Sequence, residues 1–385
     1  MNDGLIALLC GFRRGAFDAA AKQGYRVAVW DPRRLTAKHD ANVLFHIDAP
    51  LSAAGDELPE TLVAALKAYP LRLVLGPSEK GVLPAAAVRA YQHLEGMARE
   101  EAYACRDKLT MKARAMAAGL QVTPHFIVED HAKARELVTR LGLPFVIKPR
   151  LQSGSRGLRI VHSLDAANDP SFAGQLAEAF IEGRELSVES FVHGGEILFS
   201  NITDYHELRV VNIMPAALDQ GLQQEVLDFN ARAIRAFRIH HGLTHVEMYV
   251  SAKGLVFGEI AARPPGGYLM DLLSLTSHFN PWQAYVALES GQRPTLPHAR
   301  QGVAASWIIH PGAGRVDAIS GWKAIEAAPG VARAHLKLGL DDMITPRLGA
   351  GEDEGYVLIT APDHETLLAH LDAVRGLLDI QMKSA

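Results

Sequence analysis

The chain has 385 residues, 48% of them hydrophobic and 21% charged, which is enough for about two or three domains with substantial cores. No apolar run reaches the roughly 18 residues that a membrane-spanning helix needs, and a net charge of −4 argues against a nucleic-acid-binding surface. The sequence has two cysteines, Cys10 and Cys105, which are too few for a disulfide framework. The first residues do not resemble a secretory signal, and both observations predict a cytoplasmic protein.

The first hundred residues predict β-α-β units around a parallel sheet. Apolar runs cover 4–12, 25–30 and 71–75, and an alanine-rich helical stretch covers 16–23. This pattern is typical of a doubly wound, Rossmann-like α/β domain.

A dinucleotide site is the first functional candidate in this region. Gly11 and Gly15 occupy the first strand-to-helix turn, and Asp31 closes the second strand. The spacing departs from G-x-G-x-x-G, which lets the backbone approach a pyrophosphate, so an ordinary structural turn is favoured over NAD binding.

The middle of the chain combines one helix with a glycine-containing hairpin. The stretch 107–119 predicts an amphipathic helix with Leu109, Met116 and Leu120 on roughly one face, and the loop after Lys148 (L-Q-S-G-S-R-G) separates two apolar strands. Further predicted elements are a helix over 131–141, antiparallel strands in 186–202 and 244–263 around a helix over 222–238, a linker over 291–302, strands at 303–309 and 355–360, a turn at 349–351 and a helix over 363–378.

Four features of this region suit a bound nucleoside triphosphate. They are Lys108 at a helix start, Lys148 before the glycine-containing loop, the segment E-G-R-E over 182–185, and the strand glutamates Glu247 and Glu259. Each alone has a structural explanation, such as a solvated lysine or a cross-strand ion pair. Together they supply cations for phosphates, backbone N–H groups for a covering loop and carboxylates for Mg²⁺, without a Walker motif.

The motifs occur in an order that resembles the ATP-grasp carboxylate–amine ligases. The resemblance rests on D-K-L-T-M-K, F-V-I-K-P with Q-S-G-S-R-G, F-I-E-G-R-E-L-S-V, H-V-E-M-Y-V and G-E-I-A-A-R-P-P-G-G, and it covers nearly the whole chain. It implies an α/β and α+β fold with a Rossmann-like domain (1–104), an ATP-grasp domain (105–300, central lid lobe about 125–185) and a C-terminal lobe (301–385) like that of the biotin-carboxylase branch.

The same resemblance implies an ATP site. Two lysines would contact the phosphates, a small polar loop would close over them, a hinge would bind the adenine edge through its backbone, and a glutamate would bind the ribose. These residues are Lys108 and Lys148, the loop residues Ser153, Gly154, Ser155 and Gly157, the hinge Glu178 to Ile181 including Phe180, and Glu185.

It also implies that Glu247 and Glu259 bind Mg²⁺, with Mn²⁺ as a substitute, and that Arg263 faces the γ-phosphate and the acyl oxygen. The family usually has Asn two residues after the second metal glutamate; here that position is Ala261, which weakens the case for a second Mg²⁺. His245 shares a strand face with Glu247, and a structural role is favoured for it.

The function implied is ATP-dependent amide or peptide bond formation through an acyl phosphate, with release of ADP and phosphate, most like the ligases that join L-amino acids. Arg263 and Lys148 would stabilise the reacting groups, since no nucleophile motif is present. The partners would be small carboxylates and amines, without nucleic acid or membrane, and a homodimer is compatible with the resemblance.

Substrate contacts are less well defined. Glu79 follows the third strand, where open α/β sheets bind ligands, and could hold a substrate amino group; the alternative is a surface salt bridge. Tyr268 to Asp271 could line an acceptor pocket or simply begin a packed helix. Two other functions stay open: a ligase for a purine precursor or another small acid, and a nucleotide-binding regulatory protein without turnover.

Overall fold

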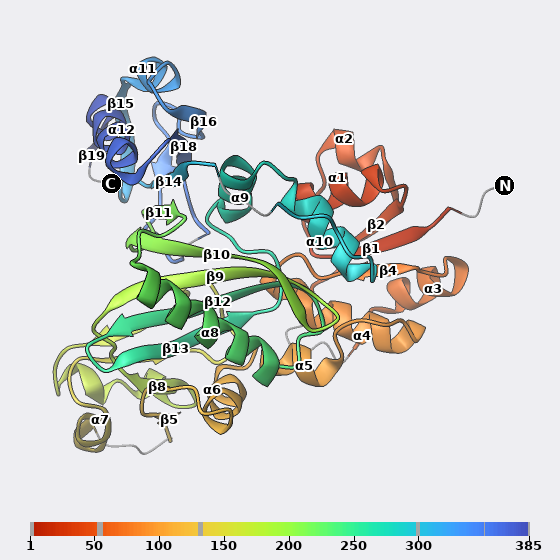
Figure 1. Ribbon diagram of the computed structural model, residues 1–385, viewed down its shortest axis with the longest axis horizontal. Helices are drawn as coiled ribbons and strands as arrows, with labels where there is room; N and C mark the ends of the chain where they lie inside the picture. Colours follow the sequence, from red (N-terminus) through yellow and green to blue (C-terminus); the bar gives the residue numbers. More distant parts are fainter. Residues whose placement is uncertain (1–3, 52–56, 130–133, 298–300, 350, 384–385) are drawn as a thin grey trace.

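A computed structural model describes residues 4–51, 57–129, 134–297, 301–349 and 351–383 (Figure 1). Its mixed α/β architecture confirms the predicted fold class. A parallel sheet, a small antiparallel sheet and a large antiparallel sheet follow one another along the chain, and the large sheet continues into the C-terminal segment.

The N-terminal sheet is parallel, in the order β3-β2-β1-β4, as the β-α-β pattern predicts. One strand of it, β3, was not predicted although four of its five residues are apolar, and most of them are only half-buried. The strands are β1 (Ile6–Cys10), β2 (Arg26–Trp30), β3 (Val43–Ile47) and β4 (Leu73–Leu75), and the helices are α1 (Arg14–Lys22), α2 (Ala37–Asp40), α3 (Glu60–Ala68), α4 (Val82–Gln92) and α5 (Arg99–Ala104).

Asp31, the acidic residue of the dinucleotide candidate, has a structural role here. Its Oδ2 accepts hydrogen bonds from the Phe12 N–H (2.7 Å) and Arg33 Nη2 (2.7 Å), and its Oδ1 accepts one from Arg33 Nε (2.9 Å). Both oxygens are therefore engaged by the protein, which favours the structural interpretation of this turn.

The small sheet has the order β5-β8-β6-β7 and is antiparallel throughout. Strands β6 and β7 form the predicted hairpin around the loop after Lys148. The elements are β5 (His125–Ile127), α7 (Ala134–Leu141), β6 (Phe145–Lys148), β7 (Arg159–Val161) and β8 (Leu176–Ala179), with single 3-10 turns at Ala166–Asn168 and Pro170–Phe172; the predicted helix residues 131–133 lie outside the described part of the chain.

The large sheet has eight strands in the order β13-β12-β9-β10-β11-β14-β18-β16. Helices α6 and α8 pack on its β12–β13 side, and helices α9 and α10 lie between it and the N-terminal sheet (Figure 1). Its first strands are β9 (Arg184–His193), β10 (Glu196–Glu207), β11 (Val211–Met214), β12 (His241–Ser251) and β13 (Gly254–Ala261), and the helices are α6 (Lys108–Ala117), α8 (Gln220–Ala236), α9 (Leu269–Ser277) and α10 (Pro281–Glu289).

The C-terminal segment adds the last three strands of this sheet and a second, three-stranded sheet in the order β17-β15-β19. The predicted strands and final helix are present, whereas β15, β16, β17, β19 and the short helix α11 were not expected. The elements are β14 (Val303–Ile309), β15 (Gly314–Ser320), α11 (Trp322–Glu326), β16 (Val331–Leu336), β17 (Met343–Ile344), β18 (Gly355–Ala361), α12 (His364–Leu377) and β19 (Asp379–Lys383); parts of the predicted linker (298–300) and turn (350) lie outside the described residues.

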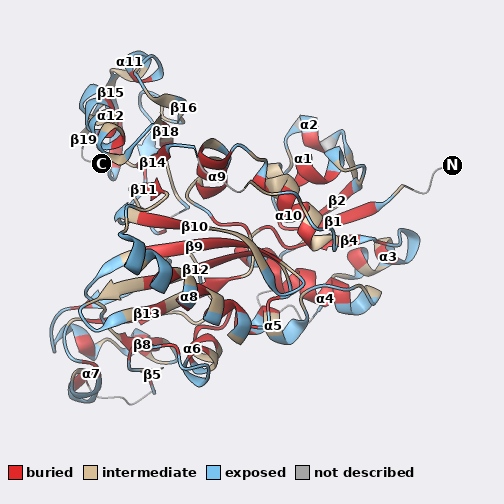
Figure 2. Cartoon of the chain, in the orientation of Figure 1, coloured by how far each residue is buried: buried red, intermediate tan, exposed pale blue. Residues whose placement is uncertain are grey.

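Burial is highest where the sheets meet their covering helices. Figure 2 shows buried residues along β1, β9, β10 and the inner faces of α1 and α4. Among the described residues, no helix combines the length and apolarity needed to cross a bilayer.

Candidate active site

The buried face of helix α6 carries two lysines. The Asp107 side chain caps the helix by accepting the Thr110 N–H (2.8 Å), and Lys108 and Lys112 then lie one turn apart on one face, 6% and 1% exposed. The predicted apolar face is wrong at Met116, which is 57% exposed, whereas Leu120 is buried and Leu109 half-buried. The helix is turned so that its lysines point toward the charged residues beneath it.

Glu178 on β8 is held between two ammonium groups. Lys112 Nζ lies 2.7 Å from its Oε2, and Lys148, the last residue of β6, forms an ion pair with its Oε1. Burial opposes ionisation of Glu178, but the two lysines outweigh that cost and lower its pKa to about 2. Glu178 thus fixes the Lys148 ammonium, a role that its predicted place in the hinge did not include.

The hinge itself connects two sheets. Ala179, the residue after Glu178, donates its N–H to the Pro124 carbonyl (3.0 Å), and the following residues lead from β8 into β9. Phe180 is 39% exposed there, while Ile181 is half-buried. The segment therefore lies at the junction of the small and large sheets.

The predicted covering loop is tied to helix α6. Lys108 Nζ donates to the Gln152 carbonyl (2.5 Å) and lies 3.4 Å from Glu259 Oε2. Gly154, Ser155 and Gly157 all have positive φ angles of 60° to 71°. At Gly157 a Cβ would lie 2.9 Å from the Pro149 ring, so that position needs glycine.

Glu247 on β12 and Glu259 on β13 are direct cross-strand neighbours. Glu185 on β9 lies nearby; burial, with the negative charge of Glu247 adding to it, raises the pKa of Glu185 to about 7. A bound cation would relieve the electrostatic repulsion among these neighbouring carboxylates. Among the described residues, no three His, Cys, Asp or Glu side chains form a ready-made metal cluster. Two carboxylates nonetheless fit a Mg²⁺ ion, which usually keeps water and phosphate ligands.

His245 lies between two carboxylates on adjacent strands. Its Nδ1 is 2.9 Å from Glu189 Oε1, and its Nε2 is 3.2 Å from Glu247 Oε1. Burial disfavours the imidazolium, but hydrogen bonds to both glutamates raise the pKa of His245 to about 9. The fully buried Glu189 also accepts from the hydroxyls of Ser187 (2.7 Å) and Thr203 (2.6 Å). His245 therefore links Glu247 to the buried Glu189 and helps to hold the Glu247 carboxylate in place.

Glu79 joins two arginines from distant parts of the chain. It begins the short 3-10 turn Glu79–Gly81 after β4, is 8% exposed, and forms ion pairs with Arg106 and with Nε of Arg263. Despite burial, which favours the neutral acid, these arginines lower the pKa of Glu79 to about 2. A surface salt bridge is thus the wrong description, since this ion-pair network is buried.

Arg263 follows β13 in the R-P-P-G-G turn, four residues after Glu259. Its Nη1 donates to the Pro264 carbonyl (2.8 Å), and its Nε faces Glu79. The end of β13 therefore places Glu259, a candidate metal ligand, close in sequence to Arg263, a candidate oxyanion donor.

Tyr268 and Asp271 connect the site to the C-terminal segment. The Tyr268 hydroxyl donates to Asp353 Oδ1 (3.0 Å), its ring centroid lies 4.0 Å from that of Tyr356, and Asp271 pairs with Arg333 (2.5 Å). Tyr268 precedes α9 with a positive φ of 64°. Tyr268 and Asp271 thus lie at the start of α9, which agrees with the alternative that this segment begins a packed helix. They also connect α9 to Tyr356 on β18 and Arg333 on β16.

Three side chains of this site, those of Lys112, Arg106 and Glu189, were not identified in the sequence analysis. Lys112 is the second lysine of D-K-L-T-M-K, and its spacing of four from Lys108 was a readable signal for a shared helix face. Arg106 and Glu189 gave no local signal, because their partners Glu79 and His245 lie far away in sequence.

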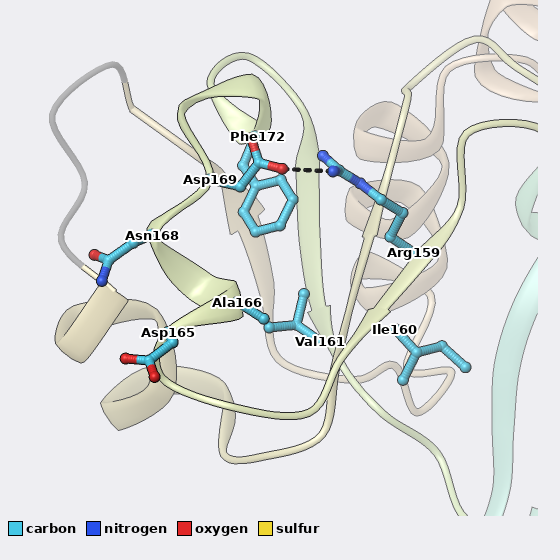
Figure 3. A pocket seen from close by; sticks show the side chains of 8 residues that line it. All are labelled: Arg159, Ile160, Val161, Asp165, Ala166, Asn168, Asp169 and Phe172. Atoms are coloured by element: carbon cyan, nitrogen blue, oxygen red, sulfur yellow. Dashed lines mark hydrogen bonds and ion pairs between the residues drawn. The ribbon is translucent and has the colours of Figure 1, made fainter.

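One cavity of about 400 Å³ lies away from all of these residues. Figure 3 shows it on the small sheet, where the Arg159 guanidinium pairs with Asp169 (2.6 Å) and lies 4.4 Å from the Phe172 ring centroid. The lining contains none of the predicted site residues, so this cavity is not the candidate active site. It is lined by Arg159, Ile160, Val161, Asp165, Ala166, Asn168, Asp169 and Phe172.

Comparison with known proteins agrees with this geometry. A family model of the ATP-grasp domain matches residues 113–279, and a model described as L-amino acid ligase C-terminal domain 2 matches residues 306–383. The chain therefore contains an ATP-grasp domain, followed by a segment that matches the C-terminal domain 2 of the L-amino acid ligases.

The chain is also similar to individual enzymes with different named activities. An L-arginine-specific L-amino acid ligase of Bacillus subtilis is 27% identical over 61% of this chain and 62% of its own length. A formate-dependent phosphoribosylglycinamide formyltransferase of Xanthomonas campestris is 29% identical over 61% of this chain and 60% of its own length. The matches thus span about three fifths of each of these two relatives.

Solved structures share the fold over nearly the whole chain. An L-amino acid ligase from Bacillus licheniformis superposes with a TM-score of 0.81 at 19% identity, covering 98% of both chains. An N5-carboxyaminoimidazole ribonucleotide synthetase from Thermotoga maritima gives 0.76 at 18% identity, covering 99% of this chain and 100% of the other.

Proposed function

We propose that this protein is an ATP-dependent carboxylate–amine ligase that joins L-amino acids through an acyl phosphate and releases ADP and phosphate. The observation that carries the proposal is the convergence of Lys148, held by Glu178, with the facing glutamates Glu247 and Glu259 and the adjacent Arg263. Phosphate cations, metal ligands and an oxyanion donor are the separate requirements of acyl-phosphate chemistry.

In this proposal ATP lies between the small and large sheets. Lys108 and Lys148 bind phosphate oxygens, and the loop from Ser153 to Gly157 covers them. The adenine binds the backbone of the hinge from Glu178 through Phe180 to Ile181, and Glu185 binds the ribose. The fixed position of Lys148 supports this, because an ammonium already oriented by Glu178 loses little freedom when a phosphate arrives.

Mg²⁺ is the proposed metal, with Mn²⁺ as a substitute, and Glu247 and Glu259 are its proposed ligands. When bound, such an ion neutralises charge on the phosphoryl oxygens. With Ala261 at the position of a possible third ligand, water or phosphate would complete the coordination.

The protein's own groups then act by electrostatics and positioning. The substrate carboxylate attacks the γ-phosphoryl group, and the amine displaces phosphate from the acyl phosphate. Lys148 stabilises the phosphoryl oxygens, and the Arg263 guanidinium stabilises the negative charge that develops on the acyl oxygen. No covalent protein intermediate is required.

For the substrates, we propose that Glu79 receives the ammonium group of the carboxylate substrate and that Tyr268 lines the site of the amine. Glu79 is ionised and buried, which suits an ammonium partner although two arginines already share it. The division into segments 1–104, 105–300 and 301–385 belongs to the same proposal.

A ligase for a purine precursor is the second candidate, because purine-pathway enzymes appear among the relatives and the structural neighbours. The test is phosphate release with ATP and Mg²⁺ across pairs of amino acids and, in parallel, with small phosphorylated amines, followed by mass spectrometry of the products. We expect a dipeptide with one ADP and no AMP per bond formed.

Three outcomes of that assay would contradict the proposal. Pyrophosphate as product would replace the acyl phosphate with an adenylate. Product from phosphorylated amines alone would favour the purine-type reaction. ATP binding without any turnover dependent on a carboxylate and an amine would favour a regulatory protein.

A further inference from the structure

Arg13 occupies the turn between β1 and α1, at the carboxyl end of a parallel strand. Its Nη2 lies 3.4 Å from the Pro265 carbonyl, and its guanidinium carbon lies 5.6 Å from the centroid of the Trp282 ring. Open α/β sheets bind ligands at this end of their strands. Because Pro265 comes two residues after Arg263, Arg13 reaches the edge of the proposed reaction site from the N-terminal sheet.

The guanidinium of Arg13 has no carboxylate partner among the described residues, and this distinguishes it from the arginines around it. Arg33 pairs with Asp31, Arg263 pairs with Glu79, and the neighbouring Arg14 pairs with Asp18 at the surface. Burial, with the positive charges of Arg263 and Arg33 adding to it and the negative charge of Asp271 offsetting only part of it, lowers the pKa of Arg13 to about 10. An anion beside Arg13 would relieve this cost.

Trp282 fixes the turn that carries Arg13. A Cβ on Gly15 would lie 2.4 Å from the indole ring, so glycine allows the ring of α10 to pack directly under the turn. The guanidinium lies over the indole ring, a cation–π contact that holds its position. The single carbonyl contact at 3.4 Å is long for a hydrogen bond, so most donors remain for a ligand.

Arg13 and Glu79 carry opposite charges and follow neighbouring strands of the same sheet, and in these proposals they serve different substrates. Strands β1 and β4, which they follow, are paired neighbours, and Arg263 lies against both residues through Glu79 and the Pro265 segment. An α-amino acid carries one ammonium and one carboxylate. In ligation the carboxylate of the first substrate is consumed, whereas that of the amine substrate stays free in the product.

We propose that Arg13 binds the free α-carboxylate of the amine substrate and thereby selects amino acids over simple amines. This inference rests on the proposed ligase function. A phosphate group would offer the same oxyanion chemistry. The carboxylate is favoured because the proposed reaction leaves it free on the amine substrate, and the test below separates it from a phosphate group.

The test compares an accepted amine substrate as the free amino acid and as its carboxamide. The wild type should prefer the acid by roughly 10- to 100-fold in kcat/KM, the range for a charge-assisted hydrogen bond. In Arg13→Gln this preference should fall to near unity, through a higher KM for the acid, while the KM for ATP stays unchanged. Arg13→Lys, which keeps the charge but loses the planar fork, should be intermediate.

Arg14→Gln is the matched control, since Arg14 is the adjacent arginine and is exposed. Its acid-to-amide ratio should equal that of the wild type. General damage to the fold lowers both rates together and leaves the ratio intact, so the ratio reports binding of the carboxylate and not stability.

The outcomes separate the possibilities. A wild-type enzyme without acid preference, or Arg13→Gln with the wild-type ratio, overturns the role of Arg13 while leaving the ligase function in place. Arg13-dependent turnover of phosphoethanolamine together with Arg13-independent turnover of amino acids assigns the residue to phosphate and overturns the carboxylate proposal. Absence of any peptide product with the wild type overturns the ligase function and this inference with it.

Discussion

Arg156 of the covering loop pairs with Glu352 of the C-terminal segment, with Nη2 3.1 Å from Oε1, although 196 positions separate them. The backbones also meet, because a Cβ on Gly349 would lie 2.9 Å from the Gly154 carbonyl oxygen. Next to Glu352, Asp353 accepts the hydroxyl of Tyr268. The covering loop therefore contacts the segment that also holds the proposed acceptor residue.

Reversing one charge of this pair should loosen the covering loop. An exposed ion pair contributes up to about 1 kcal/mol, so we expect Glu352→Arg to raise the KM for ATP by at most roughly fivefold. Hydrogen exchange over 153–157 should be slowed by ATP in the wild type and slowed less in the variant.

The charge-swapped double variant, Arg156→Glu with Glu352→Arg, provides the control. It should restore both the KM for ATP and the slowing of hydrogen exchange by ATP. Equal protection of the loop with and without ATP in the wild type would remove its role as a lid. Failure of the double variant to recover would show that the ion pair itself does not matter.

Glu259→Gln should abolish phosphate release while the protein stays folded. The amide is a poor ligand for Mg²⁺, and it also removes the anion 3.4 Å from Lys108 Nζ. Phosphate release at saturating Mg²⁺ measures the activity, Mn²⁺ binding followed by electron paramagnetic resonance measures the metal site, and circular dichroism checks the fold.

Glu196→Gln serves as the comparison, since Glu196 is an exposed glutamate that pairs with Arg293. It should keep both activity and metal affinity. Near-wild-type turnover in Glu259→Gln would remove this glutamate from the metal site.

Glu79 should make the folded state sensitive to acid. Its pKa is lowered from 4.5 to about 2, so its contribution to the free energy of unfolding is complete above pH 4.5 and is lost as the pH falls toward 2. At roughly 1.4 kcal/mol per pKa unit, this contribution is about 3 kcal/mol. Glu79→Gln should therefore be less stable than the wild type at pH 7, and the difference should shrink between pH 4.5 and pH 3.

Denaturant unfolding at several pH values measures this difference. Glu100→Gln alters an exposed ion pair with Arg114 and should show little change at any pH. A gap between wild type and Glu79→Gln that stays constant down to pH 3 would mean that Glu79 does not titrate as the buried ion pairs imply.

The fold was largely predictable because its strands follow hydrophobic periodicity. The parallel strands β1, β2 and β4, the hairpin around Lys148 and the strands β14 and β18 are all apolar runs. The strands that escaped prediction, such as β16 and β19, are short and mostly half-exposed, so burial does not impose an apolar pattern on them.

The sequence offers candidates for the site only through short motifs. Lysines beside a glycine-containing loop and two strand glutamates could be located from motifs alone. The contacts among them could not, since the apolar-face rule failed on α6, whose buried face carries Lys108 and Lys112. Likewise, the pairing of Glu79 with Arg263 joins residues 184 positions apart and depends on how the sheets pack.

Arg263→Ala should lower kcat/KM for condensation by several hundredfold, equivalent to roughly 3–4 kcal/mol of transition-state stabilisation, with little change in the affinity for ATP. The reason is the loss of a preorganised donor toward the acyl oxygen. The same change leaves buried Glu79 with Arg106 alone, so the variant should also unfold more easily.

Arg263→Lys separates these two effects. Lysine keeps a positive charge near Glu79 and should recover much of the stability, yet it lacks the planar fork and should recover only part of the activity. Activity is measured well below the melting temperature of each variant, and hydroxylamine trapping reports the acyl phosphate. If Arg263→Ala is fully folded and within tenfold of the wild type in both assays, Arg263 is a structural partner of Glu79, and the donor to the acyl oxygen must be another residue.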